Sequence, residues 1–504
     1  MRIVETDLLA SPPFGARAEA RDDAVDPARG PGSLGRATVL FGLGALAGKV
    51  AGLVALPIFA RLLTPAEFGR LDVLNALLSA LILALLLGTD VAATRLYFDR
   101  HDPRGRGELL ASWYALGLGV IAPIALGLVI LSEPLSRALF ATTDLAFAID
   151  LVGVIVVAGM AYTITLGVLR TTGRPLAYAL LEGGALTANA VLAIAFLAWW
   201  RADATSVMLA LAVIWSVAAV LGLWAVNRSI AVAPSRAAIA ELLRLGLPLA
   251  PAVAATLGAD FLNRAFLLGS AGATEAGYLS IAIRIASVAG LIVVATQLAW
   301  QPHAYRLGES AAALARLASE ARVIVVGLSA AVGVMGLLSP EIVAVVGAGR
   351  YGPAVPAVGL ALIGMLGSGL FAVASLRSAM TRATRDIGMS ALVGVGCAVV
   401  LNLILAPRFG ATGTAAAIAT GQSVPVGVVA FLGRRTRLPA AWPRLALIAA
   451  TAVVVVWLGS SYFASSIGVR AVILLAFAAA LALEGTLSDS SRALLHDRRA
   501  GGAT

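Results

Sequence analysis

The chain has 504 residues, of which 60% are hydrophobic and 13% are charged, about half the charged fraction of an ordinary soluble domain. A soluble globule cannot bury so much apolar surface, so these proportions exclude a soluble multidomain enzyme. One cysteine and three widely separated histidines exclude an intramolecular disulfide and a cysteine- or histidine-rich metal site. The net charge is +10, but the arginines gather at one predicted membrane face, and nucleic acid is not an expected partner.

The N-terminal segment, residues 1–36, is rich in Pro, Gly, Ala, Arg and Asp and has no apolar period. This composition predicts a disordered cytoplasmic tail. It lacks the apolar stretch of a signal peptide. A second cytoplasmic tail is expected at 487–504.

From residue 37 onward the chain consists of successive apolar segments. Most of them are long enough to cross a bilayer core about 30 Å thick as a helix. The runs are continuously apolar rather than alternating, which favours helices over a β-barrel. The sequence therefore predicts an all-α integral membrane protein with about 14 transmembrane helices. The predicted spans are 37–60, 71–96, 108–132, 146–169, 176–199, 205–227, 245–268, 275–300, 317–338, 355–376, 388–406, 411–433, 445–463 and 467–485.

The basic residues divide unevenly between the two sides of these spans. Of the 37 lysines and arginines, 27 fall in the N-terminus, the even-numbered loops and the C-terminus, against 7 in the odd-numbered loops. Cytoplasmic loops carry the excess of basic residues, so both termini are predicted to be cytoplasmic.

The two halves of the chain also resemble each other. Three pairs of matching positions occur in order, namely 67–71 with 275–279, 131–134 with 338–341, and Asn189 with Asn402. Their nearly constant offset predicts two six-helix bundles related by a parallel repeat, the usual plan of an alternating-access transporter. The predicted divisions are a first bundle at 37–228, a cytoplasmic linker at 229–244, a second bundle at 245–435, and two extra transmembrane helices at 436–486.

Ionisable residues inside the spans are the candidate functional residues, because a charge at the bilayer centre costs about 2.5–3.5 kcal/mol on the insertion scale. Lys49, near the middle of the first span, is either a cavity cation that holds an anionic headgroup or an ion-pair partner of a carboxylate such as Asp90. Arg284 is either a second cavity cation or snorkels to the outer interface. Arg264 follows Asp260 by four residues, and this spacing favours a pair within one helix.

Three further residues are candidates for gating or coupling. Asp90 and Arg95 end the second span, where plain interfacial charges are favoured over gating contacts. Glu182, about seven residues into the fifth span, is either a proton or cation coupling site or the partner of an arginine. The chain has no phosphate-binding P-loop and no catalytic or metal-binding constellation, so we expect a transporter without covalent chemistry and without a cofactor.

Several of these residues resemble the motifs of polysaccharide-biosynthesis membrane proteins, the Wzx-type oligosaccharide flippases. The resemblance covers about residues 37–435. It is carried by Lys49, 57–69, 88–90 and 95–97 in the first half, and by 244–249, 263–264, 277–279, 282–284 and 301–302 in the second. One position departs from the family pattern, since Asn263 precedes Arg264 where the family usually has Asp; Asp260 is the candidate substitute.

The resemblance implies a V-shaped pair of bundles of the multidrug/oligosaccharidyl-lipid/polysaccharide exporter superfamily in the bacterial inner membrane. Its implied cargo is a polyprenyl-pyrophosphate-linked oligosaccharide that moves from the cytoplasmic to the outer leaflet. Membrane lipids, a polysaccharide polymerase and glycosyltransferases are the implied partners. Two alternatives stay open: a flippase for the peptidoglycan precursor lipid II, and a MATE-like multidrug exporter, which Lys49 and the two extra spans disfavour. A membrane scaffold for glycan assembly is a less favoured reading.

Overall fold

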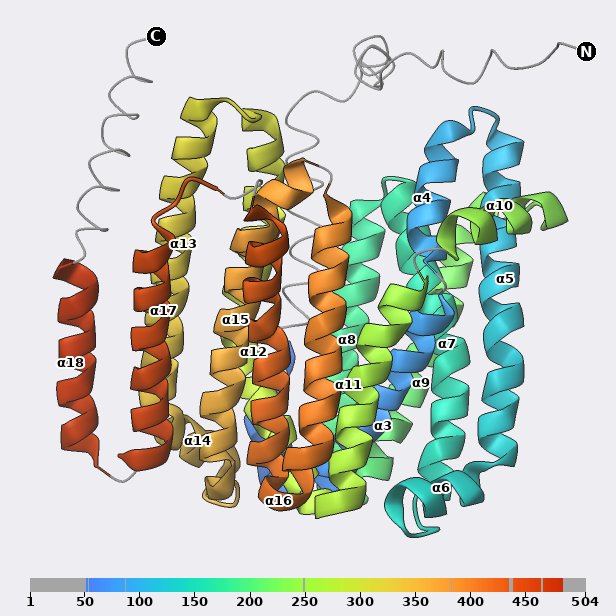
Figure 1. Cartoon of the computed structure of the whole chain (residues 1–504). Coiled ribbons are helices and arrows are strands. Elements are labelled where there is room, and N and C mark those ends of the chain that lie inside the picture. The colour runs from blue at the N-terminus through green and yellow to red at the C-terminus, as the bar shows by residue number, and fades with distance from the viewer. Residues whose placement is uncertain are drawn as a thin grey trace, which may run out of the picture.

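The computed structural model describes residues 51–483, apart from 53, 87, 248, 249, 382, 435–437, 464 and 465. Both predicted tails, Lys49 and most of the first span lie outside the described residues. No strand occurs in the described part of the chain, and the molecule is all-helical, as predicted (Figure 1).

The first half of the chain begins with helical residues 54–62, which lead into α3. The helices that follow are α3 (Pro65–Leu85), α4 (Thr89–Asp99), α5 (Pro103–Ile130), α6 (Ser132–Phe140), α7 (Ala146–Thr171), α8 (Pro175–Trp199), α9 (Ala204–Val226) and the linker helix α10 (Arg236–Gly246). The predicted span 71–96 is wrong as a single helix, since α3 and α4 are separated by Gly88. Gly88 has φ 65°, a left-handed conformation that glycine adopts without penalty.

In the second half, as in the first, a short helix (α14, like α6) lies between two long ones. The second half consists of α11 (Ala250–Ala271), α12 (Ala273–Leu307), α13 (Ala311–Leu337), α14 (Ser339–Gly347), α15 (Val355–Met380), α16 (Thr384–Leu432), α17 (Trp442–Trp457) and α18 (Ile467–Leu483). Helix α16 is two helices joined at Gly410, where φ is 55°. This break separates the predicted spans 388–406 and 411–433.

Nine helices among the described residues are long and apolar enough to cross a membrane. One of the nine is α16, which contains two of the predicted spans. Helices α3 and α11 fall outside that set, and α18 is a shorter apolar helix. The chain is therefore a multi-pass membrane protein, while the count of 14 stays a prediction.

The repeat is visible as equivalent contacts in the two halves. Glu67 Oε2 accepts a hydrogen bond from the backbone N–H of Ala204 at the start of α9, at 2.9 Å. Glu275 Oε2 accepts one from the N–H of Ala411, just after the α16 break, at 2.7 Å. In both cases a carboxylate satisfies a free N–H group at a helix N-terminus. These pairs are offset by 208 and 207 residues, whereas the match of Asn189 with Asn402, at 213, stays a prediction.

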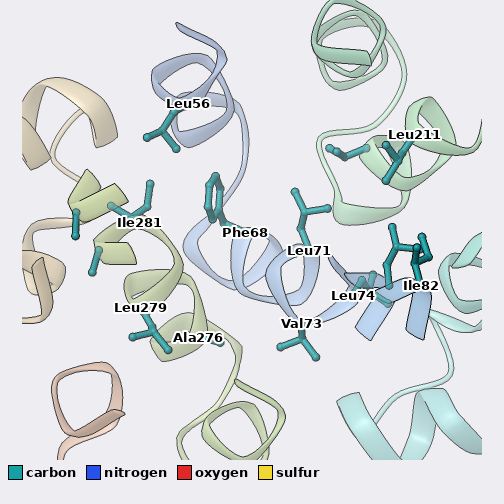
Figure 2. Close-up of a cluster of buried hydrophobic side chains, with 14 of the residues drawn as sticks. Leu56, Phe68, Leu71, Val73, Leu74, Ile82, Leu211, Ala276, Leu279 and Ile281 are labelled. Carbon is teal, nitrogen blue, oxygen red and sulfur yellow. The ribbon is translucent and has the colours of Figure 1, made fainter. Parts of the chain in front are cut away.

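Helix α3 joins the two halves. It packs on α7 and α9 of its own half and on α11 and α12 of the other half. Figure 2 shows apolar side chains of α3 that point toward each half. Leu71 and Leu74 lie on the side of Leu211 in α9, and Val73 lies across from Ala276 and Leu279 in α12. These residues belong to one buried core. The core therefore runs through both halves along α3.

Candidate functional site at the bundle interface

A close backbone crossing brings the first turns of α3 and α12 together. Gly69 and Gly277 occupy equivalent positions of the repeat. A Cβ atom at Gly69 would overlap the carbonyl oxygen of Ala273, and one at Gly277 would overlap that of Pro65. Small residues permit such approaches between membrane helices. Glycine at both positions therefore fixes where the two halves touch.

A charged cluster lies beside this crossing. Asp72, on α3, comes from the first half, and Arg264 on α11 and Arg284 on α12 come from the second. Arg264 Nε donates to Asp72 Oδ2 at 2.8 Å, and Arg284 Nη2 lies 3.8 Å from Asp72 Oδ1. One carboxylate thus joins two arginines from the opposite half.

The pair of Asp72 and Arg264 is well shielded, with side chains 12% and 11% exposed. Arg264 also forms an ion pair with Asp260, which confirms the pair predicted from their spacing. Asp260 thus faces the arginine although the family acid at position 263 is replaced by Asn. Instead, the buried Asn263 accepts a hydrogen bond at its backbone oxygen from Asn402 Nδ2, at 3.1 Å.

Arg284 is less enclosed, with a side chain 38% exposed. Its guanidinium carbon lies 5.2 Å from the centre of the Phe68 ring, a cation–π distance. Its Nε also lies 3.4 Å from Ser280 Oγ, one turn earlier on α12. Arg284 therefore contacts α3 of the first half.

Further contacts close the same end of the molecule. Arg61 Nη2 donates to the backbone oxygen of Val345 in α14 at 3.1 Å. The fully buried Tyr351 reaches the backbone oxygen of Leu63 with its hydroxyl at 3.5 Å and packs edge-on against Phe68. Burial raises the pKa of the Tyr351 hydroxyl. Helices α6 and α14 lie at this end, and α4 and α10 at the opposite end (Figure 1).

The other predicted site residues lie apart from this cluster. Asp90 is in the first turn of α4, and Arg95 is exposed on the same helix. Neither forms an ion pair within the described residues. Glu182 lies on α8, which packs on α7 and α9. The alternative pairing of Lys49 with Asp90 falls outside the described residues.

Sequence reasoning missed Asp72. It is the second residue of the predicted span 71–96, near the membrane interface, where a charge costs less than at the bilayer centre and so gives a weak signal. A second signal was available in the repeat, because Asp72 follows Gly69 by three residues, as Ser280 follows Gly277. Asp72 is charged whereas its equivalent, Ser280, is not, and such a difference between equivalent positions indicates a candidate functional residue.

Comparison with known proteins agrees with this architecture. The sequence model of the polysaccharide biosynthesis protein family matches residues 34–307. The chain belongs to this family. No curated protein matches it in sequence.

Solved structures of two transporter types share the fold. The lipid II flippase MurJ, in an inward closed conformation, is similar with a TM-score of 0.65 and 13% identity over 88% of this chain and 99% of that chain. A multidrug resistance MATE family transporter of the MOP superfamily, in an inward-facing conformation, has a TM-score of 0.57 and 16% identity, covering 82% of this chain and 98% of that chain. The chain therefore shares the fold of these two solved transporters.

Proposed function

We propose that the protein moves a polyprenyl-pyrophosphate-linked oligosaccharide from the inner to the outer leaflet of a bacterial cytoplasmic membrane. The bundles 37–228 and 245–435 would alternate in access around the cargo, with the linker 229–244 between them and the hairpin 436–486 beside the second bundle. Both termini are assigned to the cytoplasm by the arginine bias. A polysaccharide polymerase and glycosyltransferases are the proposed partners.

The observation that carries this proposal is the cluster of Asp72, Arg264 and Arg284 between the two halves. With the termini cytoplasmic, the end that bears α6 and α14 faces outward, so the cluster closes the outer side. A pyrophosphate cannot cross hydrocarbon unaided, because burying an unpaired ion costs many kcal/mol. Arginines form charge-assisted hydrogen bonds to phosphate. Arg264 and Arg284 are therefore assigned to the outer part of the headgroup's path.

Lys49 is assigned to the middle of that path from its position in the sequence. A compact ammonium at mid-depth offers an attractive contact where the penalty for the phosphates is greatest. This assignment rests on the predicted span, since Lys49 lies outside the described residues. The proposed activity involves no covalent chemistry.

The test uses purified protein in vesicles that contain a fluorescent lipid-linked oligosaccharide. We expect Lys49→Ala to remove most transfer between leaflets, Lys49→Arg to keep part of it, and Lys49→Glu to be worse than Ala. Arg137→Ala is the matched control, because Arg137 is 64% exposed in a surface pair with Glu133. Normal transfer by Lys49→Ala would refute the role of Lys49.

Parallel vesicles with lipid II and with a cationic drug distinguish the alternatives. Transfer of the oligosaccharide lipid in preference to both supports the proposal. Preferential transfer of lipid II would assign the peptidoglycan precursor instead, and uptake of the drug alone would assign a multidrug exporter.

A further inference from the structure

The linker helix α10 crosses α4 and α5 near one end of the molecule, whereas those two helices run along the bundle (Figure 1). It packs on both of them. Its buried residues, Ala238, Leu242 and Gly246, recur every four residues and share one helix face. Because this face lies against the sides of α4 and α5, the opposite face of α10 points sideways, away from the protein.

Two hydrogen bonds fix the orientation of α10 on the first half. Ser112 Oγ of α5 accepts a hydrogen bond from the backbone N–H of Ser235, the N-cap residue of α10, at 2.9 Å. Arg100, just after α4, donates from Nη2 to Glu241 Oε2 at 2.7 Å. Glu241 is the one acidic residue in the sequence of α10. The negative charge of the helix is therefore neutralised on the side of α4.

The outward face of α10 carries two arginines. Arg236, Ala240 and Arg244 are exposed, and their spacing of four residues places them on one helix face. Within the part of the chain that the structure describes, neither arginine has an ion pair or a side-chain hydrogen bond. Leu247, close to Arg244, is 53% exposed. Cations beside an apolar side chain are typical of a helix that lies in a membrane interface.

An exposed tryptophan indicates the level of the membrane surface near α10. Trp224, in the last turn of α9, is 80% exposed, and tryptophans are enriched where membrane helices reach the lipid headgroups. The exposed Arg228 follows one turn later. The connection to α10 is short, and it packs on α5, where Val232 lies against Gly107. Helix α10 therefore begins close to the level of the headgroups.

We propose that the outward face of α10 binds the phosphate groups of anionic phospholipids in the adjoining leaflet, through Arg236 and Arg244, with Leu247 among the upper acyl chains. Guanidinium groups form charge-assisted hydrogen bonds to phosphate, and basic residues on an amphipathic helix attract anionic lipids. A second copy of the same face is disfavoured, because like charges repel. Since α10 joins the two halves, the bound lipids hold the linker at the membrane surface.

The test places a fluorophore between the two arginines, at Ala240→Cys in a Cys397→Ala background. The protein is reconstituted in vesicles of phosphatidylcholine with phosphatidylglycerol as the minority lipid. Bromine, which quenches fluorescence on contact, is carried by one lipid or the other at equal mole fraction. We expect brominated phosphatidylglycerol to quench more, with a local preference of about five-fold for each arginine. The preference should shrink in about 1 M salt, where the screening length falls to about 3 Å.

Variants separate the role of this face from that of net charge. Arg236→Gln combined with Arg244→Gln should abolish the preference, whereas lysine at both positions should keep most of it, because an ammonium also attracts phosphate. The matched control combines Arg137→Gln with Arg201→Gln and removes the same charge from the opposite end of the molecule. The side chains of these two arginines are 64% and 66% exposed. The control should keep the preference of wild type.

Each contrary outcome identifies a different error. Equal quenching by the two lipids, or a preference that survives in the double glutamine variant, overturns the proposal. Loss of the preference on addition of inorganic phosphate would assign the face to a free anion, and shielding of the fluorophore from both lipids would assign it to another polypeptide; either result overturns lipid binding. The measurement involves no transport, so its outcome is independent of the proposed function.

Discussion

The contact between Asp72 and Arg264 allows a quantitative prediction about closure of the molecule at the α6–α14 end. Asp72→Asn keeps the shape of the side chain and removes its charge. Hydrogen bonds to charged groups contribute about 1.5–3 kcal/mol, and both partners are almost completely shielded from solvent. Arg264 keeps its second partner, Asp260, so we expect the closed state to lose about 2 kcal/mol of stability relative to the open state. This free energy shifts the equilibrium between the two states about thirty-fold toward the open one.

The assay measures distances between the two halves at the α6–α14 end by pulsed electron paramagnetic resonance. Spin labels attach to Thr143→Cys, after α6, and Val345→Cys, in α14, both exposed positions. Cys397 is the one native cysteine and is first replaced by alanine. We expect Asp72→Asn to move a large part of the distance distribution to longer values.

The matched control is Glu133→Gln, which removes one carboxylate charge from an exposed pair with Arg137. Exposed pairs contribute about 0–1 kcal/mol, so its distance distribution should match that of wild type. An unchanged distribution in Asp72→Asn would refute the reasoning, because the interfacial contact would then contribute nothing to closure.

Two further predictions concern packing and pH. Gly277→Ala should weaken closure at the α6–α14 end by about 1–3 kcal/mol through overpacking, measured in the same distance assay. Gly119→Ala, where a Cβ meets nothing within 4 Å, should leave closure unchanged, and equal behaviour of the two variants would contradict the close crossing. In α14, at the α6–α14 end, a hydrogen bond from Arg470 lowers the pKa of the Glu341 carboxyl below its ordinary value of 4.5. A lowered folded-state pKa means that this stabilisation is complete above the ordinary value and is lost as pH falls through the folded-state value. In thermal unfolding, Glu341→Gln should therefore be less stable than wild type at neutral pH, with the difference shrinking in acid; a difference that grows in acid would contradict this.

Much of the fold could be predicted because a bilayer imposes simple rules on the sequence. Apolar runs located almost every long helix. The matched segments 67–71 and 275–279 contain Gly69 and Gly277 of the crossing of α3 and α12, but the sequence did not predict that they touch. The break at Gly88 was missed because it lies inside an apolar run, where hydropathy carries no information about a left-handed backbone. The break at Gly410 was found because the runs on its two sides are separate.

The candidate site was predicted only where its contacts are local. The spacing of Asp260 and Arg264 indicated their pair, since residues four apart share a helix face. The pair of Asp72 and Arg264 joins residues 192 positions apart, and no periodicity indicates such a contact. It depends on how the two halves pack, which one sequence without structure does not provide.

The two halves are similar in backbone structure, but the charged residues at their interface are not equivalent. The repeat offset of 208 aligns Asp72 with Ser280, Arg264 with Leu56, and Arg284 with Ala76. The acid that faces the opposite half therefore belongs to the first half alone, and both arginines that it contacts belong to the second. Cations at all equivalent positions would repel each other across the crossing, whereas this arrangement attracts.

The same asymmetry connects closure with cargo. Asp72 occupies part of the hydrogen-bonding capacity of Arg264 and lies 3.8 Å from Arg284. A phosphate that binds either guanidinium uses the same N–H groups in the same charge-assisted way. Under the proposed function, an anionic headgroup at this site would compete with Asp72, and every contact that it gained there would weaken the contact that joins the two halves at this end. A neutral or cationic compound offers no such competition, so under the proposed function this interface would favour opening of this end by an anionic cargo over other cargo.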